Sequence, residues 1–234
     1  MSNTKVLYFL PGTMCDERLW ENLWHSIELK FDSCVKFKPL SIPISDSIEN
    51  IVDHLANKIE DRANLIGFSL GGYLGAAIAL KYPEKIAKLA ILSNLPIAMQ
   101  AKEVKERRRA INFIKRHGYG GISNKRISEL LAEQNYHPSL VDLITKMDRD
   151  LGERVLVNQL EITTKRDSLV SCLVKRKDTV RFILGDQDCI WPIQKIKDNL
   201  QNGQQFRLDI IRNCGHMSPI EKPKEIAELL AGWF

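Results

Sequence analysis

Short apolar runs with strong β propensity alternate along this chain with longer amphipathic helical patterns. We predict strands over residues 5–10, 34–40, 64–68, 86–93, 179–185 and 206–213. Helical patterns lie between and after them, over residues 16–30, 45–61, 70–82, 192–200 and 223–233. This alternation predicts an α/β fold with a mostly parallel central sheet flanked by helices.

Residues 96–167 interrupt the alternation. This stretch has helical periodicity and no strand pattern, and it predicts three or four helices, over residues 101–118, 123–135, 137–152 and 153–166. Gly, Asn and Pro separate these helices. We therefore predict a core made of residues 1–95 and 168–234, and a helical lid formed by residues 96–167, inserted between the fourth and fifth strands.

Composition limits the classes of protein to consider. A chain of 234 residues fits one large domain with an insertion. The net charge of +5 is too small to indicate a nucleic-acid partner, and no apolar run reaches the ~20 residues of a membrane span. The five cysteines are scattered and odd in number, which predicts neither a disulfide framework nor a metal site. Because the first residues also lack the features of a secretory signal, we expect a cytoplasmic protein.

One motif with chemical meaning lies at the end of the third predicted strand. Gly67-Phe68-Ser69-Leu70-Gly71 matches G-x-S-x-G, with a strand before it and a helix after it. Such an elbow holds its serine at a strained backbone angle, so small residues are needed on both sides. The alternative is a plain strand–turn–helix corner.

A nucleophilic serine needs a base, and His216 is the best candidate. It follows the last predicted strand on a loop that contains Gly215, at the sheet edge where parallel sheets place catalytic groups. The other four histidines lie in predicted helices or at their ends, where a solvated surface role is favoured. They are His25, His54, His117 and His137.

The base in turn needs an acid, and two candidates follow the fifth predicted strand. Asp186 and Asp188 both come shortly after Gly185, where either might instead cap a turn. With either one, the chain order is Ser, Asp, His, as expected for a nucleophile elbow of this type. Residue type, order and strand-end position agree, so we predict that Ser69 is a nucleophile.

Four segments resemble the α/β-hydrolase superfamily, in the lid-bearing branch of small esterases, enol-lactonases and carbon–carbon bond hydrolases. They are residues 10–20, 65–93, 181–192 and 214–233, so the resemblance runs nearly end to end. In that family the acid usually stands three residues after the glycine that ends the strand. The resemblance thus implies Asp188 as the acid, with Asp186 as the second choice.

The resemblance also implies an oxyanion hole made of two backbone N–H groups. One comes from Leu70, directly after the nucleophile, and the other from Thr13 in the loop after the first strand, with Met14 as an alternative. The family commonly has His-Gly where this chain has Pro11-Gly12, which leaves the shape of that loop open. A simple Pro-Gly turn is the other interpretation.

Side chains next to these motifs are candidates for lining a substrate pocket beneath the helical lid, and each is equally suited to the core. They are Met14, Phe68, Leu95, Trp191 and Met217. Cys15 lies beside the predicted oxyanion loop, but nothing near it in the sequence supplies a base, so we assign it to packing.

The first predicted helix of the lid is basic. Its cationic residues are Arg107, Arg108, Arg109, Lys115 and Arg116. The favoured interpretation is a solvated helix face interleaved with Glu103 and Glu106. The alternative is a landing surface for an acidic partner, such as an acyl carrier protein or an acyl-coenzyme A thioester.

Together these features predict a serine hydrolase that cleaves an ester-type bond of a small or medium acyl substrate through an acyl-enzyme, with no metal or organic cofactor. The alternatives on the same triad are an acyltransferase, a thioesterase or a carbon–carbon bond hydrolase or lyase. An alternative outside catalysis is a hydrolase-like protein that binds its ligand without fast turnover.

Overall fold

The computed structural model describes residues 4–31, 34–200 and 206–234. Within them it forms one six-stranded sheet in the order β2-β1-β3-β4-β5-β6, and every neighbouring pair is parallel. The strands are β1 Lys5–Leu10, β2 Val35–Pro39, β3 Ala63–Phe68, β4 Ile86–Leu92, β5 Val180–Gly185 and β6 Arg207–Ile211. The predicted α/β fold with a parallel central sheet is thus confirmed, and the sheet is parallel throughout.

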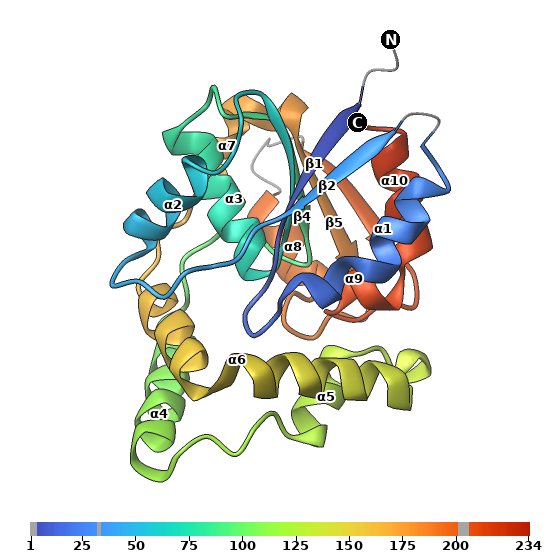
Figure 1. Cartoon of the computed structure of the whole chain (residues 1–234). Helices are drawn as coiled ribbons and strands as arrows, with labels where there is room; N and C mark the ends of the chain where they lie inside the picture. The colour runs from blue at the N-terminus through green and yellow to red at the C-terminus, as the bar shows by residue number, and fades with distance from the viewer. Residues whose placement is uncertain (1–3, 32–33, 201–205) are drawn as a thin grey trace.

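Helices cover both faces of this sheet (Figure 1). The α-helices outside residues 96–167 are α1 Glu21–Glu28, α2 Ile48–Ala56, α3 Leu70–Lys81, α7 Val170–Leu173, α8 Ile193–Leu200, α9 Ser218–Glu221 and α10 Pro223–Ala231. Two 3-10 helices, η1 Glu17–Trp20 and η3 Val174–Thr179, complete this set. None of the helices in the described ranges is both long and apolar enough to cross a membrane.

The core has two halves because successive strand residues point to opposite faces of the sheet. Leu7 and Phe9 of β1 pack in the half that α1 and α10 cover. Tyr8 and Leu10 pack in the other half, beneath α2, α3 and α8. α3 is buried along most of its length, since nine of its twelve residues are buried, and this packing fixes the position of the helix that follows Ser69.

The helical segment of residues 96–167 forms a separate layer next to the carboxyl ends of the strands, at the bottom of Figure 1. It contains α4 Ala101–His117, α5 Asn124–Leu130, the 3-10 helix η2 Glu133–Asn135 and α6 Pro138–Thr164. α6 is broken at Gly152, whose φ of 73° and ψ of 178° are not helical. That break lies at the boundary between the last two helices predicted from the sequence.

Candidate active site

Ser69 lies at the turn between β3 and α3 in a strained backbone conformation, with φ 48° and ψ −114°. Positive φ is uncommon for residues other than glycine and persists only where surrounding contacts impose it. Here the Ser69 N–H donates to the carbonyl of Leu92 at 2.9 Å. Its own carbonyl accepts from the N–H groups of Gly72 and Tyr73, at 2.9 and 3.2 Å. These bonds hold the serine at the tip of the turn.

The glycines on either side of Ser69 are required by close backbone approach. A Cβ at Gly71 would lie 2.0 Å from the carbonyl oxygen of Leu10, and a Cβ at Gly67 would lie 2.5 Å from the carbonyl oxygen of Gly71. Both distances are far below van der Waals contact, and the opposing atoms are backbone. The G-x-S-x-G spacing therefore allows β1, β3 and α3 to meet at the serine.

We expect Gly71→Ala to lower the free energy of unfolding by about 3 kcal/mol or more, because its methyl group would overpack rigid backbone. Gly120→Ala is the matched control, since a Cβ there has no atom within 4 Å among the described residues. Urea unfolding followed by circular dichroism measures both. A loss for Gly71→Ala no greater than that for Gly120→Ala would contradict this steric argument.

Ser69, His216 and Asp188 form a continuous hydrogen-bonded chain. His216 Nε2 lies 3.1 Å from Ser69 Oγ, and His216 Nδ1 lies 2.8 Å from Asp188 Oδ2. The other carboxylate oxygen of Asp188 accepts from the N–H groups of Ile190 and Trp191, at 2.8 and 3.0 Å. Asp188 and His216 are 3% and 4% exposed, so this chain is shielded from water except at the serine.

The other sequence candidates for acid and base lie elsewhere. Asp186 is exposed, and its Oδ1 accepts from the N–H of Cys214 at 3.2 Å, as a turn cap does. His25, His54, His117 and His137 are all exposed. Of the predicted candidates, the structure brings only Asp188 and His216 into this chain with Ser69.

The loop that carries His216 is held by the helical segment. The N–H groups of His216 and Met217 both donate to the carbonyl of Leu130, at 2.8 and 3.3 Å. Glu221 Oε2 accepts from the N–H groups of Gly215 and Ala132, at 3.0 and 2.9 Å. Sequence reasoning missed Leu130 and Glu221. A backbone carbonyl leaves no signal in a sequence, and Glu221 follows no motif.

The loop after β1 contains the two residues considered for the second oxyanion donor. The N–H of Met14 donates to Gln159 Oε1 of α6 at 3.0 Å. In the part of the chain that the structure describes, the N–H groups of Thr13 and Leu70 have no hydrogen-bond acceptor. Both residues line the same cavity as Ser69. This arrangement favours Thr13 over Met14 as the partner of Leu70.

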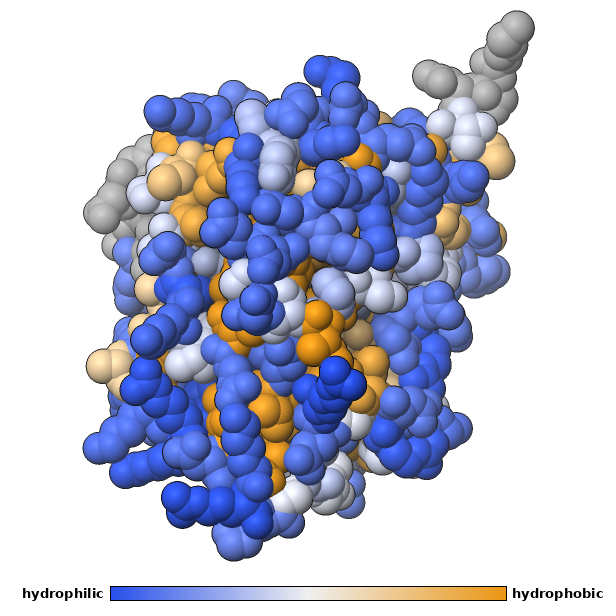
Figure 2. Space-filling view, turned by 60° about the vertical axis from the view of Figure 1, so that its left-hand side comes forward, coloured by the Kyte–Doolittle hydropathy of each residue, from blue (hydrophilic) through white to orange (hydrophobic). Residues whose placement is uncertain are grey.

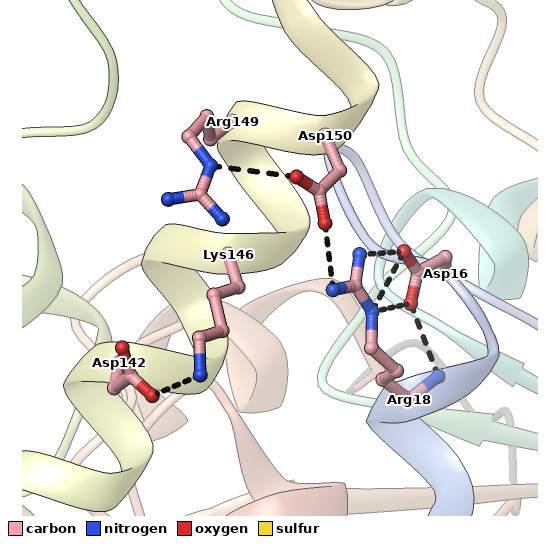
Figure 3. Close-up of polar contacts among 6 residues, drawn as sticks. All are labelled: Asp16, Arg18, Asp142, Lys146, Arg149 and Asp150. Atoms are coloured by element: carbon pink, nitrogen blue, oxygen red, sulfur yellow. Dashed lines mark hydrogen bonds and ion pairs between the residues drawn. The ribbon is translucent and has the colours of Figure 1, made fainter.

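α6 is also tied to this loop by an ion-pair cluster. Figure 3 shows Arg18 between Asp16, which follows the loop, and Asp150 on α6. Its Nε lies 2.9 Å from Asp16 Oδ1, and its Nη1 lies 2.8 Å from Asp150 Oδ2. Ion pairs at a protein surface contribute little stability. Here these ion pairs, together with the hydrogen bond from Met14 to Gln159, fix the position of α6 relative to Thr13 and Met14.

A cavity of about 650 Å³ lies above Ser69, between the strand ends and the helical segment. Of the predicted pocket residues, Met14, Phe68, Trp191 and Met217 line it. Leu95 does not line it and is fully buried in the core instead.

A second hollow lies between α2, α4 and α6, and its apolar lining residues are Ile48, Ile111 and Ile162. Figure 2 views the molecule from the side of α2 and α4. Hydrophobic residues gather at the centre of that face, framed by hydrophilic ones.

Cys15 lies near the cavity but is unsuited to act as a nucleophile. Its side chain is buried, and this burial, with a smaller contribution from the charge of Asp16, raises the pKa of the thiol to about 12. A reactive cysteine needs the opposite shift, toward the thiolate. The packing role assigned to Cys15 from the sequence agrees with this environment.

Comparisons with known proteins agree with this architecture. The family model for the alpha/beta hydrolase fold matches residues 41–223. The chain is 23% identical over 254 aligned positions to the biotin biosynthesis bifunctional protein BioHC of Teredinibacter turnerae, covering 97% of this chain and 44% of that protein. It is 33% identical over 63 positions to a pimeloyl-[acyl-carrier protein] methyl ester esterase of Shewanella woodyi, covering 27% of this chain and 25% of that protein. The chain thus spans less than half the length of these curated relatives.

Solved structures share the fold. A thermophilic esterase from Thermogutta terrifontis superposes with a TM-score of 0.81 at 20% identity, covering 98% of this chain and 89% of that one. At this identity the likeness concerns the fold alone. The family match extends over most of the chain and includes the turn with Ser69 and the loops that carry Asp188 and His216. This chain therefore belongs to the α/β-hydrolase fold family.

Proposed function

We propose that this protein is a serine hydrolase that cleaves an ester-type bond of a small or medium acyl substrate. The observation that carries the proposal is the hydrogen-bonded chain from Ser69 Oγ through His216 to Asp188, at 3.1 and 2.8 Å. The strained φ of Ser69 and the cavity above it support the same conclusion. Nucleophile, base and orienting acid are the three roles that acyl transfer requires.

In the proposed mechanism His216 Nε2 takes the proton of Ser69 Oγ as the oxygen attacks the substrate carbonyl. Asp188 stabilises the resulting imidazolium through Nδ1. The tetrahedral oxyanion accepts hydrogen bonds from the N–H groups of Leu70 and Thr13, each of which is worth about 3 kcal/mol of barrier lowering.

The alcohol then leaves with the proton from His216, and an ester bond to Ser69 Oγ remains. Water attacks this acyl-enzyme while His216 accepts one of its protons. That proton returns to Ser69 Oγ as the acid departs. These steps need no metal or organic cofactor.

We also propose that residues 96–167 act as a lid that shapes the substrate pocket. α4 and α6 contribute Arg107, Leu156, Leu160 and Thr163 to the cavity wall opposite Ser69. This lid is not a freely hinged flap, because the carbonyl of Leu130, at the end of α5, accepts hydrogen bonds from the loop that carries His216.

A carrier-linked substrate is a second candidate. One relative is named as an esterase acting on a pimeloyl-[acyl-carrier protein] methyl ester. In this chain α4 presents Arg108, Arg109 and Arg116 to solvent, which is a suitable surface for an acidic carrier. With such a partner, turnover of the carrier-linked ester would fall with ionic strength while that of a truncated ester would not.

The test of the proposed function uses p-nitrophenyl esters of increasing acyl length together with a fluorophosphonate probe. We expect turnover that depends on chain length, and one covalent label per chain located at Ser69 by mass spectrometry. Absence of both would contradict the proposal. Labelling of Ser69 without ester turnover would favour the carbon–carbon bond hydrolase, acyltransferase or ligand-binding alternatives.

A further inference from the structure

The wall of the cavity contributed by the helical segment carries a cluster of arginines. Arg107 comes from α4, Arg126 from α5 and Arg166 from the residues after α6, and all three line the cavity that contains Ser69. Such a concentration of positive charge inside a pocket of about 650 Å³ is unexpected for a site that binds only neutral esters.

Arg107 is one of two arginines in this cluster without a salt bridge to any acid in the described residues. It is partly buried, and its Nη1 donates to Thr163 Oγ1 at 2.7 Å. It forms no ion pair with any residue in the described ranges. Burial, and then the charge of Arg166, lowers the pKa of Arg107 to about 10. Arg107 is therefore a partly desolvated cation that lines the same cavity as a second cation, Arg166.

Arg166 has the same character. It is partly buried, its Nε donates to the carbonyl of Ile97 at 3.0 Å, and its guanidinium lies 5.1 Å from the ring centroid of Tyr73. Burial lowers its pKa. The hydrogen bond to Ile97 and the contact with the Tyr73 ring orient the guanidinium but do not neutralise its charge. No described residue forms an ion pair with Arg166.

None of the nearby carboxylates among the described residues forms an ion pair with Arg107 or Arg166. Burial lowers the pKa of both arginines and the charge of Glu103 opposes this, but the Glu103 carboxylate forms an ion pair with Lys195 at 2.8 Å. Glu129 pairs with Arg126 at 2.9 Å. Asp148 accepts from the hydroxyl of Tyr119 at 2.6 Å and from the N–H of Ile122 at 2.9 Å. Glu106 lines the cavity from an exposed position on α4.

Two like charges that are both largely removed from water in one cavity are costly unless a counter-charge joins them. Proteins keep such pairs where a ligand supplies the negative group, and a guanidinium matches a carboxylate through two parallel hydrogen bonds. The apolar side chains of Phe68, Leu156 and Leu160 line the same cavity and suit a short hydrocarbon chain between the ester and that group.

We propose that Arg107 and Arg166 form an anion subsite that binds a free carboxylate on the substrate. This inference rests on the proposed function, and it narrows the substrate class to esters that keep an ionised acid group. The carboxylate belongs either to the acyl part, as in a half-ester of a dicarboxylic acid, or to the alcohol part.

Two matched pairs of esters test the proposal and distinguish these sources. p-Nitrophenyl hydrogen glutarate against its methyl ester places the charge on the acyl part. 4-Acetoxybenzoate against methyl 4-acetoxybenzoate places it on the alcohol part. We expect the anionic member of one pair to have a kcat/KM on the order of tenfold or more above its neutral partner. Equal values in both pairs would overturn the proposal.

Substitutions of the arginines then test whether these two side chains cause the preference for anionic esters. Arg107→Gln and Arg166→Gln should each bring the ratio of anionic to neutral kcat/KM toward one. Arg109→Gln is the matched control, because Arg109 is exposed on the same helix and lies outside the cavity lining. It should leave the ratio unchanged. A ratio that Arg109→Gln lowers as much as Arg107→Gln does would assign the preference to general surface charge and overturn the subsite.

A binding measurement separates failure of the subsite from failure of the proposed chemistry. Calorimetric titration of the Ser69→Ala protein with glutarate needs no turnover. Binding that Arg107→Gln weakens about tenfold or more would support the subsite even if every ester were inert. Active esters without preference, together with no glutarate binding, would overturn the subsite and leave the hydrolase standing. Inorganic phosphate binding more tightly than glutarate would overturn the assignment to a carboxylate.

Discussion

Replacing Ser69 by alanine should reduce kcat for ester hydrolysis at least roughly 10,000-fold. The substitution removes the hydroxyl oxygen that lies 3.1 Å from His216 Nε2, and no other hydroxyl of the described residues bonds to that nitrogen. The protein should remain folded. Alanine keeps the same backbone strain at φ 48°, and the bonds that hold the turn come from backbone atoms.

Rate assays and fluorophosphonate labelling measure this loss, and urea unfolding checks the fold. Ser128→Ala is the control, since Ser128 is exposed on α5 and its hydroxyl bonds only to the carbonyl of Lys125 at 2.8 Å. The control should keep full activity. Turnover of Ser69→Ala within tenfold of the unmodified protein would remove Ser69 from the mechanism.

Asp188→Asn should lower kcat by roughly 10,000-fold at neutral pH, because an amide neither fixes the required tautomer of His216 nor stabilises its charged form. The substitution keeps the shape of the side chain, and the remaining oxygen still accepts from the N–H groups of Ile190 and Trp191. A kinetic loss with little change in stability is therefore expected.

Asp186→Asn is the matched comparison, two residues away on the same loop. Its oxygen caps the N–H of Cys214 at 3.2 Å from an exposed position, and an asparagine oxygen does the same. Steady-state kinetics should find this variant close to the unmodified protein. The opposite order, with Asp186→Asn slow and Asp188→Asn fast, would make Asp186 the orienting acid.

Much of the fold was predictable because local pattern and global topology agree. All six predicted strands are present, and the parallel arrangement follows from the helices between them. Parallel strands bring their carboxyl ends to one edge of the sheet. The residues after β3, β5 and β6 therefore lie near one another, which is why the sequence alone indicates Ser69, Asp188 and His216 as candidates.

Other parts of the candidate site depend on tertiary placement that no local pattern encodes. Arg107, Arg108 and Arg109 are adjacent in the sequence, yet only Arg107 lines the cavity with Ser69. The rotation of α4 about its axis decides this, and packing against α6 sets that rotation. The contact between Gln159 and the N–H of Met14 spans 145 residues of sequence, so only the docking of α6 reveals it.

The bonds between Leu130 and the histidine loop have a consequence for how such a protein can diversify. A Cβ at Gly215 would lie 2.6 Å from the backbone nitrogen of Ala132, so the two segments touch main chain to main chain. Replacing residues 96–167 by the corresponding helices of a relative would therefore disturb the position of the His216 imidazole as well as the pocket. New substrate preferences are more accessible through single side-chain replacements on α4 and α6 than through exchange of the whole segment of residues 96–167.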